Sequence, residues 1–165
     1  MKHLNKMILI AFIAITSVAN YSCSKDGDDT SNNNNTPKAK VVTINFKVDG
    51  VAFQSASTKA LFETDTKRMV LSASGKDQKS VLDLNFATDK GSTFALSSAN
   101  SDASIVMQVS GSVLDAYIAE SGNLNITNHN TEKKIIEGTF NMVGVNANDS
   151  KDKKNFTEGK FYAEY

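Results

Sequence analysis

The sequence predicts an all-β domain over residues 41–165, a single antiparallel β-sandwich of nine or ten strands. Apolar and polar residues alternate with a period of two in many short runs, glycine-containing turn signals separate these runs, and helix-period patterns are weak. A period of two buries one face of each strand and leaves the other in water, which is typical of antiparallel sheets.

The alternating runs define the expected strands in order. Val42, Ile44 and Phe46 alternate with polar residues in the first run, and Leu124 and Ile126 do so in a later one. Taken together, the runs predict strands at about 41–49, 51–56, 68–74, 80–88, 92–97, 104–110, 113–119, 123–128, 134–145 and 155–165.

Turn chemistry supports these divisions. Asp49-Gly50 is a strong hairpin signal, because glycine accepts the positive φ of a tight turn. Gly75-Lys76-Asp77, Asp89-Lys90-Gly91 and Ser121-Gly122-Asn123 predict further turns. The segment Val113–Glu120 also fits the three-four spacing of a short helix, although a strand is favoured there.

The apolar faces are expected to meet in a packed interior. Five phenylalanines supply much of it: Phe46, Phe86, Phe94, Phe140 and Phe161. The alternative architecture is a lipocalin-like β-barrel, in which the sheet closes around a small-molecule cavity.

A pattern near the end of the chain occurs twice. Glu137-Gly138-Thr139-Phe140 and Glu158-Gly159-Lys160-Phe161 each place a glycine two residues before a phenylalanine. We interpret them as one hairpin of two long strands joined by the polar loop 146–155. Each glycine would allow a bend or the close approach of an aromatic ring. An anion cradle is disfavoured, because no helix N-terminus follows either glycine.

The N-terminal segment has the organisation of an export signal. Lys2 and Lys6 precede the apolar run Met7–Val18, and the small residue Ser22 directly precedes Cys23. The run is too short to span the roughly 30 Å hydrocarbon core of a bilayer as a helix. Residues 1–22 resemble a bacterial lipoprotein signal peptide. This resemblance implies that Cys23 becomes the first mature residue, carries acyl chains such as palmitate, and anchors the protein in the bacterial outer membrane.

Two features leave alternatives to this interpretation. Lipoprotein signals usually have leucine three residues before the cysteine, where this chain has Asn20, and Ser17-Val18-Ala19 also fits a cleavage site. Cleavage there would release a periplasmic or secreted protein with a free thiol. Cys23 is the only cysteine, so no internal disulfide can form.

Residues 23–40 are expected to comprise the lipidated Cys23 and a disordered tether, because residues 24–40 include no bulky apolar side chain. The acidic stretch Lys25–Asp29 resembles the export signals of Bacteroidetes surface lipoproteins, and a solvated linker is the alternative. Its aspartates lack the glutamate that a helix-loop-helix calcium site requires, so no metal site is predicted there.

The charge balance argues against a nucleic-acid partner. The chain has 18 Lys and Arg against 18 Asp and Glu, and removal of Lys2 and Lys6 with the signal leaves a net charge of −2. Nucleic-acid binding requires a basic surface, so we predict no such partner.

A search for catalytic residues yields no candidate. His129 is the one histidine of the mature chain, and the flanking Asn128 and Asn130 suggest an exposed, idle loop residue without metal-ligand partners. No Gly-x-Ser-x-Gly elbow is present. Asp115 and Glu137 could be imagined as a glycosidase pair, but a surface rich in carboxylates makes such pairs common. We predict neither an enzyme nor a cofactor.

Three tyrosines are the sequence's candidates for a sugar-binding face. Tyr117, Tyr162 and Tyr165 could form an aromatic platform, although tyrosines more often sit at the edge of a core with the hydroxyl in water.

The chain also resembles a family of Bacteroidetes lipoproteins with a C-terminal domain of unknown function. The resemblance rests on Gly122–Thr127, Lys134–Phe140 and Glu158–Phe161, where the family shows Gly-x-Ile-x-Ile-Thr, Gly-Thr-Phe and Gly-x-Phe. The Asp49-Gly50 turn followed by Phe53 also fits, although tryptophan is frequent at that last position. The family carries no established catalytic residues, so the resemblance implies no chemistry.

These observations favour a surface-anchored, non-catalytic binding or accessory module with a carbohydrate or protein ligand. A structural envelope protein or a small-ligand-binding, lipocalin-like barrel are the alternatives. A hydrolase is disfavoured by the missing nucleophile and base.

Overall fold

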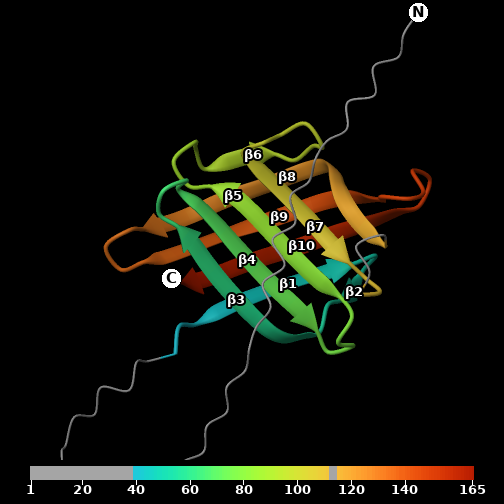
Figure 1. Ribbon diagram of the computed structural model, residues 1–165, viewed down its shortest axis with the longest axis horizontal. Helices are drawn as coiled ribbons and strands as arrows, with labels where there is room; N and C mark the ends of the chain where they lie inside the picture. Colours follow the sequence, from blue (N-terminus) through green and yellow to red (C-terminus); the bar gives the residue numbers. More distant parts are fainter. Residues whose placement is uncertain (1–38, 112–114) are drawn as a thin grey trace, which may run out of the picture. The chain divides into compact units, whose positions relative to one another are not determined.

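The computed structural model describes residues 39–111 and 115–165 (Figure 1). The signal peptide 1–22, Cys23 and nearly all of the predicted tether lie outside the described residues, so these expectations and the domain boundary at residue 41 stay predictions. The described residues form ten strands and no helix, as the sequence predicts. The strands are β1 (Val42–Val48), β2 (Val51–Ala52), β3 (Ser55–Glu63), β4 (Arg68–Gly75), β5 (Val81–Ala87), β6 (Thr93–Ala95), β7 (Ala103–Gln108), β8 (Ala116–Asn130), β9 (Ile135–Asn146) and β10 (Lys153–Glu164).

All strand pairs are antiparallel and belong to one sheet in the order β2-β1-β10-β9-β8-β7-β5-β4-β3, with β6 paired to β8. The sheet curls so that its two halves face each other (Figure 1). Thr58 Oγ1 of β3 donates a 2.6 Å hydrogen bond to the Val42 carbonyl of β1, near the other end of the strand order. The curled sheet confirms the all-β class and is compatible with both a sandwich and a barrel.

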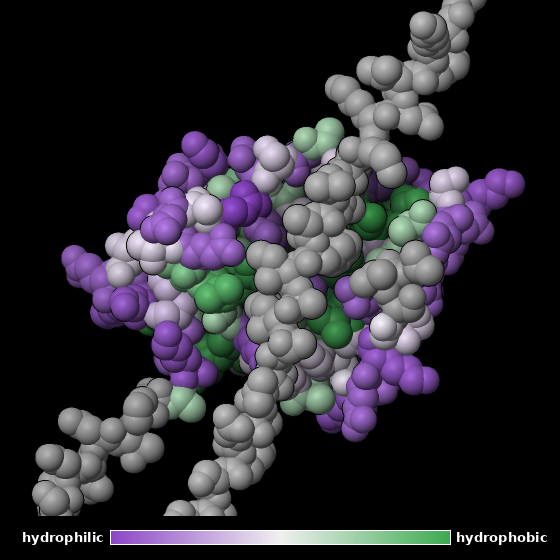
Figure 2. Space-filling view, viewed as in Figure 1, coloured by the Kyte–Doolittle hydropathy of each residue, from purple (hydrophilic) through white to green (hydrophobic). Residues whose placement is uncertain are grey.

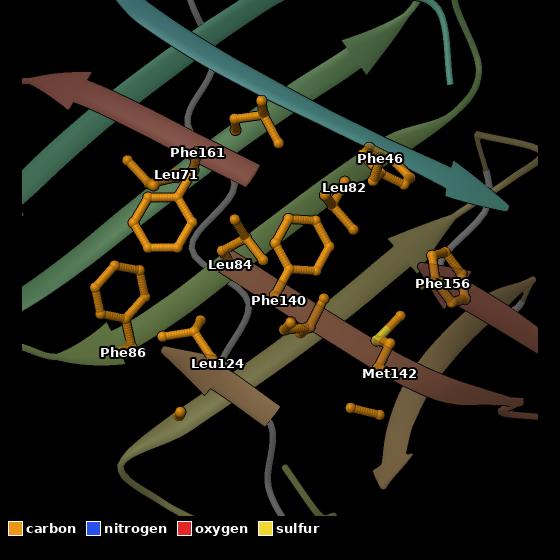
Figure 3. Close-up of a cluster of buried hydrophobic side chains, with 14 of the residues drawn as sticks. Phe46, Leu71, Leu82, Leu84, Phe86, Leu124, Phe140, Met142, Phe156 and Phe161 are labelled. Carbon is orange, nitrogen blue, oxygen red and sulfur yellow. The ribbon is translucent and has the colours of Figure 1, made fainter. Parts of the chain in front are cut away.

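The interior between the two halves is filled by the inward side chains of the alternating runs. Figure 3 shows phenylalanines and leucines from β1, β4, β5, β8, β9 and β10 pointing toward one another. The rings of Phe86 on β5 and Phe161 on β10 have centroids 5.4 Å apart, which joins the two halves. All five phenylalanines predicted for the core are buried. Hydrophilic residues occupy most of the visible periphery in Figure 2.

The Asp49-Gly50 turn is confirmed. Asp49 and Gly50 have φ values of 48° and 82°, as the two central residues of a tight hairpin turn require. The following strand is shorter than predicted, because β2 ends at Ala52 and a separate strand, β3, begins at Ser55. The sequence interpretation missed most of β3. Its polar stretch Ser55–Lys59 masks the alternation, and the strand lies at the end of the strand order with one face in water.

The turn predicted at Ser121-Gly122-Asn123 is wrong. These residues lie inside β8, which is one long strand with register shifts at 119–121 and 126–128. Gly122 has a φ of 128°, and a Cβ there would lie 2.2 Å from the carbonyl oxygen of Asn141. A glycine at a β-bulge therefore produced a turn signal inside a strand. The favoured strand at 113–119 is confirmed for 116–119, and residues 112–114 lie outside the described residues.

The predicted end hairpin is confirmed. β9 and β10 pair along their length, with Phe161 opposite Gly138 and Phe140 opposite Gly159. The connection is shorter than expected, because the two strands extend to Asn146 and from Lys153.

Candidate functional site

An open pocket is lined by the segment before β1, the end of β3 with the β3–β4 turn, the β5–β6 connection, the end of β8 with the β8–β9 turn, and Tyr165 after β10. The C label in Figure 1 marks the end of β10. Its volume is about 710 Å³. We call it the Tyr165 pocket and define it by the aromatic side chains Phe62, His129 and Tyr165 and the lysines Lys40, Lys67 and Lys134.

Three rings form one aromatic row along this pocket. The ring centroids of Phe62 and Tyr165 are 4.8 Å apart, and those of His129 and Tyr165 are 6.0 Å apart. Phe62 is inward because it pairs across the strands with the buried Met69. Tyr165 continues the inward positions of β10, after Phe161 and Ala163.

His129 and Tyr165 are joined by a hydrogen bond between His129 Nε2 and Tyr165 Oη, 2.8 Å long. Burial lowers the pKa of His129 and raises the pKa of Tyr165. At neutral pH the pair is therefore an uncharged imidazole beside a protonated phenol. It offers polar atoms to a ligand but no charge.

The three lysines come from different segments. Lys40 precedes β1, Lys67 ends the β3–β4 turn and Lys134 ends the β8–β9 turn. Lys67 and Lys134 have positive φ values of 53° and 54°. Among the residues that line the pocket, Asp89 has the one carboxylate side chain.

Backbone hydrogen bonds hold the two turns in place. The Lys67 carbonyl accepts bonds from the amide and hydroxyl of Thr88, at 2.8 and 2.9 Å. The Lys134 carbonyl accepts a 2.9 Å bond from the amide of Tyr165. These bonds tie the β3–β4 turn to the segment after β5 and tie the end of β10 to the β8–β9 turn.

A family model described as a domain of unknown function (DUF6252) matches residues 40–163. The chain belongs to the DUF6252 family. This confirms the expected domain of unknown function, while the link to Bacteroidetes lipoproteins stays an expectation. No curated protein and no solved structure matches the chain. The DUF6252 match includes Lys40, Phe62, Lys67, His129 and Lys134 of the Tyr165 pocket.

The expectation that His129 is an exposed loop residue is wrong. In this DUF6252 domain His129 is half-buried on β8 and bonded to Tyr165, rather than exposed in a loop. The two flanking asparagines resemble a loop, but the register shift at 126–128 places His129 opposite the buried Ile136. Directly paired residues share a face of the sheet, so His129 points inward.

The three tyrosines do not gather on one face. Tyr117 is buried and donates a 2.6 Å hydrogen bond to Asp152 Oδ2, and Tyr162 donates a 3.1 Å bond to Glu164 Oε1. Of these three tyrosines, only Tyr165 lines the Tyr165 pocket. The residues of the sequence-derived sugar face are therefore dispersed over the DUF6252 domain.

The imagined carboxylate pair is separated. Glu137 Oε1 accepts a bond from Asn128 near the start of β9, and Asp115 Oδ1 accepts one from Asn146 at its end. Nine residues of strand between Glu137 and Asn146 correspond to roughly 30 Å. The two carboxylates cannot flank one glycosidic bond.

Two further findings concern only residues 39–111 and 115–165. No group of three or more His, Cys, Asp or Glu side chains in these ranges could hold a metal ion. No helix in the same ranges is long and apolar enough to cross a membrane.

A second pocket, of about 280 Å³, lies beside β2 and the β4–β5 turn and is lined largely by apolar groups. Two of its three charged side chains already have partners. Asp77 accepts bonds from Ser80, and Lys154 pairs with Asp49 at 3.5 Å. The Tyr165 pocket is larger and combines rings with lysines, so it is the stronger candidate.

Proposed function

We propose that the protein is a lipid-anchored module of the bacterial cell envelope that binds a ligand in the Tyr165 pocket and carries out no reaction on it. The observation that carries the binding part is the Tyr165 pocket itself. Cys23 at the end of the export signal carries the anchoring part.

The composition of the pocket supports binding. Small-molecule sites are clefts of about 300–1,000 Å³ with mostly apolar walls and a few polar groups. The Tyr165 pocket has about 710 Å³, apolar side chains from Ala60, Leu61 and Phe62, and polar atoms on His129 and Tyr165.

The contacts of the His129–Tyr165 pair fit a binding role. His129 Nε2 and Tyr165 Oη are hydrogen-bonded at 2.8 Å, and burial lowers the pKa of His129 and raises that of Tyr165. Both side chains are therefore uncharged at neutral pH and can offer hydrogen bonds to a ligand.

The anchoring part follows from the sequence. Acylated Cys23 would hold the protein in the outer membrane, and the acidic segment Lys25–Asp29 would direct it to the cell surface. A periplasmic or secreted protein is the alternative if cleavage occurs after Ala19.

The binding part is tested by an NMR screen of the purified, ¹⁵N-labelled protein against neutral, anionic and cationic fragments of one-ring and two-ring size. We expect the shift changes to concentrate on the amides around Phe62, His129 and Tyr165. Hits spread evenly over the domain, or an absence of hits, would overturn the proposal and favour a structural envelope protein.

A further inference from the structure

We propose that the Tyr165 pocket takes a small organic carboxylate. Its acid group is held by Lys40, Lys67 and Lys134, which we call the lysine rim, and its apolar, ring-sized body packs on the aromatic row. This inference rests on the proposed function and adds the chemical class of the ligand.

The first support is the convergence of charge. Lys40, Lys67 and Lys134 come from three segments far apart in the sequence and line one hollow. Asp89 is the one carboxylate side chain among the lining residues, so the three lysines leave an excess of positive charge around the hollow. A bound anion would offset that excess. Two lysines elsewhere on the domain pair with carboxylates: Lys47 with Glu158 at 2.7 Å and Lys153 with Glu120 at 2.6 Å.

The second support is the aromatic row of Phe62, His129 and Tyr165, which forms the floor of the pocket. Phe62 and Tyr165 present contacting rings, and the imidazole of His129 is uncharged at neutral pH because burial lowers its pKa. An uncharged aromatic floor favours an apolar body over a fully hydrated one. The ligand therefore needs both parts: a charged group for the rim and a hydrophobic group for the floor.

The third support is the geometry of the lysines, whose backbones are held and whose side chains are exposed. Hydrogen bonds to Thr88 and Tyr165 hold the backbone of Lys67 and Lys134. The side chains of both lysines are exposed, and lysine ends in a compact point charge on a flexible stem. Such a rim suits a carboxylate in more than one orientation. It lacks the planar, bidentate geometry that arginine would provide.

Three probes separate the two parts of the ligand. 2-Naphthoate carries the ring body and the charge, 2-naphthamide carries the body without the charge, and acetate carries the charge without the body. Binding is measured by NMR titration of the purified protein at low ionic strength. We expect 2-naphthoate to bind at the Tyr165 pocket, 2-naphthamide to bind there several-fold more weakly, and acetate to bind weakest.

Variants identify the groups responsible. The double variant Lys67→Gln, Lys134→Gln should weaken 2-naphthoate by about fivefold to tenfold, as expected for two exposed charge pairs, and leave 2-naphthamide unchanged. The control Lys133→Gln removes one lysine charge at the turn position next to Lys134, which does not line the pocket, and should change neither affinity. Thermal unfolding midpoints of all variants confirm that they fold.

The outcomes distinguish this inference from the proposed function. If both naphthyl probes bind at the pocket with equal affinity and the double variant changes neither, the carboxylate inference fails while the binding site stands. If 2-naphthoate binds only away from Phe62, His129 and Tyr165, the carboxylate inference also fails. Whether the Tyr165 pocket binds any ligand is then decided by the fragment screen.

Discussion

The phenyl ring of Phe161 on β10 covers Gly138 on the neighbouring strand β9. The two residues are directly paired, and a Cβ added to Gly138 would lie 2.3 Å from Phe161 Cζ and 2.2 Å from the Asn125 carbonyl oxygen. Phe140 stands in the same relation to Gly159, where a Cβ would lie 2.6 Å from Phe140 Cγ. These two pairs explain the repeated Gly-x-Phe pattern: each ring needs a strand position without a side chain.

Gly138→Ala should therefore destabilise the domain. The methyl group has no space between a ring and a carbonyl on an adjacent strand, and overpacking of this kind costs about 1–3 kcal/mol. The free energy of unfolding from urea denaturation checks this. Asn141→Ala, at an exposed position of β9, is the control and should change stability little. Equal stability of the two variants would contradict the packing of Phe161 on Gly138.

Phe140→Ala and Phe161→Ala should each cost about 3–5 kcal/mol, the usual range for a buried phenylalanine. Both side chains are buried. Because total stability is roughly 5–15 kcal/mol, the double variant should not fold. Unfolding midpoints of the three variants test this expectation. If each single variant unfolds like the parent, the rings do not contribute to the core.

Stability should decrease as the pH falls from 7.5 toward 5. Burial lowers the pKa of His129 below its ordinary value of about 6.5, so the unfolded chain takes up a proton before the folded chain does. The contribution is fully present above the unfolded pKa and is lost as the pH falls through the folded pKa. Urea midpoints at three pH values should show a shallower decrease for His129→Gln than for the parent. Parallel curves would contradict a buried, neutral His129.

A second pH effect should appear in acid. Hydrogen bonds from the Ser80 hydroxyl and from the amides of Ser80 and Lys79 lower the pKa of Asp77 to about 2. Ionised Asp77 therefore stabilises the β4–β5 turn above its ordinary pKa of 3.8, and this stabilisation is lost as the pH falls through about 2.

Asp77→Asn should be less stable than the parent at pH 7, and the difference should shrink below pH 4. Asp65→Asn, in the β3–β4 turn, is the matched control. Thermal midpoints across this range give the comparison, and a difference that is constant with pH would show that the charge of Asp77 has no role.

Cys23→Ala should move the protein from the membrane fraction to the soluble fraction, and fatty-acid labelling should follow Cys23. The reason is that Cys23 is the only thiol and lies at the end of the predicted export signal. Membrane association that persists in the variant would exclude acylation of Cys23 as the anchor.

Much of the sheet could be predicted because burial follows the period of two. β1, β4, β5, β7, β9 and β10 each place apolar residues on one face, and their positions agree with the sequence interpretation. Most of β3 was not predicted, because residues Ser55–Lys59 do not alternate between apolar and polar types. β8 was divided in two because Gly122 belongs to a bulge and not to a turn. Bulges are local changes of register that a pattern of residue types does not reveal.

The Tyr165 pocket could be predicted only in part. Tyr165 continues the alternation of Phe161 and Ala163, so its inward position could be predicted from the sequence. His129 faces inward because of the register shift at 126–128, and the lysines converge through turns from distant segments. A site assembled from five separate segments has no fixed spacing, so its composition emerges only when the sheet curls.

The most direct test of the binding site is the same NMR fragment screen repeated on a variant with a filled pocket. Ala60→Phe adds a ring to a half-buried position that lines the Tyr165 pocket, and Ala56→Phe adds the same ring at an exposed position of β3 outside the pocket. We expect Ala60→Phe to lose the hits around His129 and Tyr165 and Ala56→Phe to keep them, with both variants folded by their thermal midpoints. Hits that survive unchanged in Ala60→Phe would contradict the assignment of the Tyr165 pocket as the binding site.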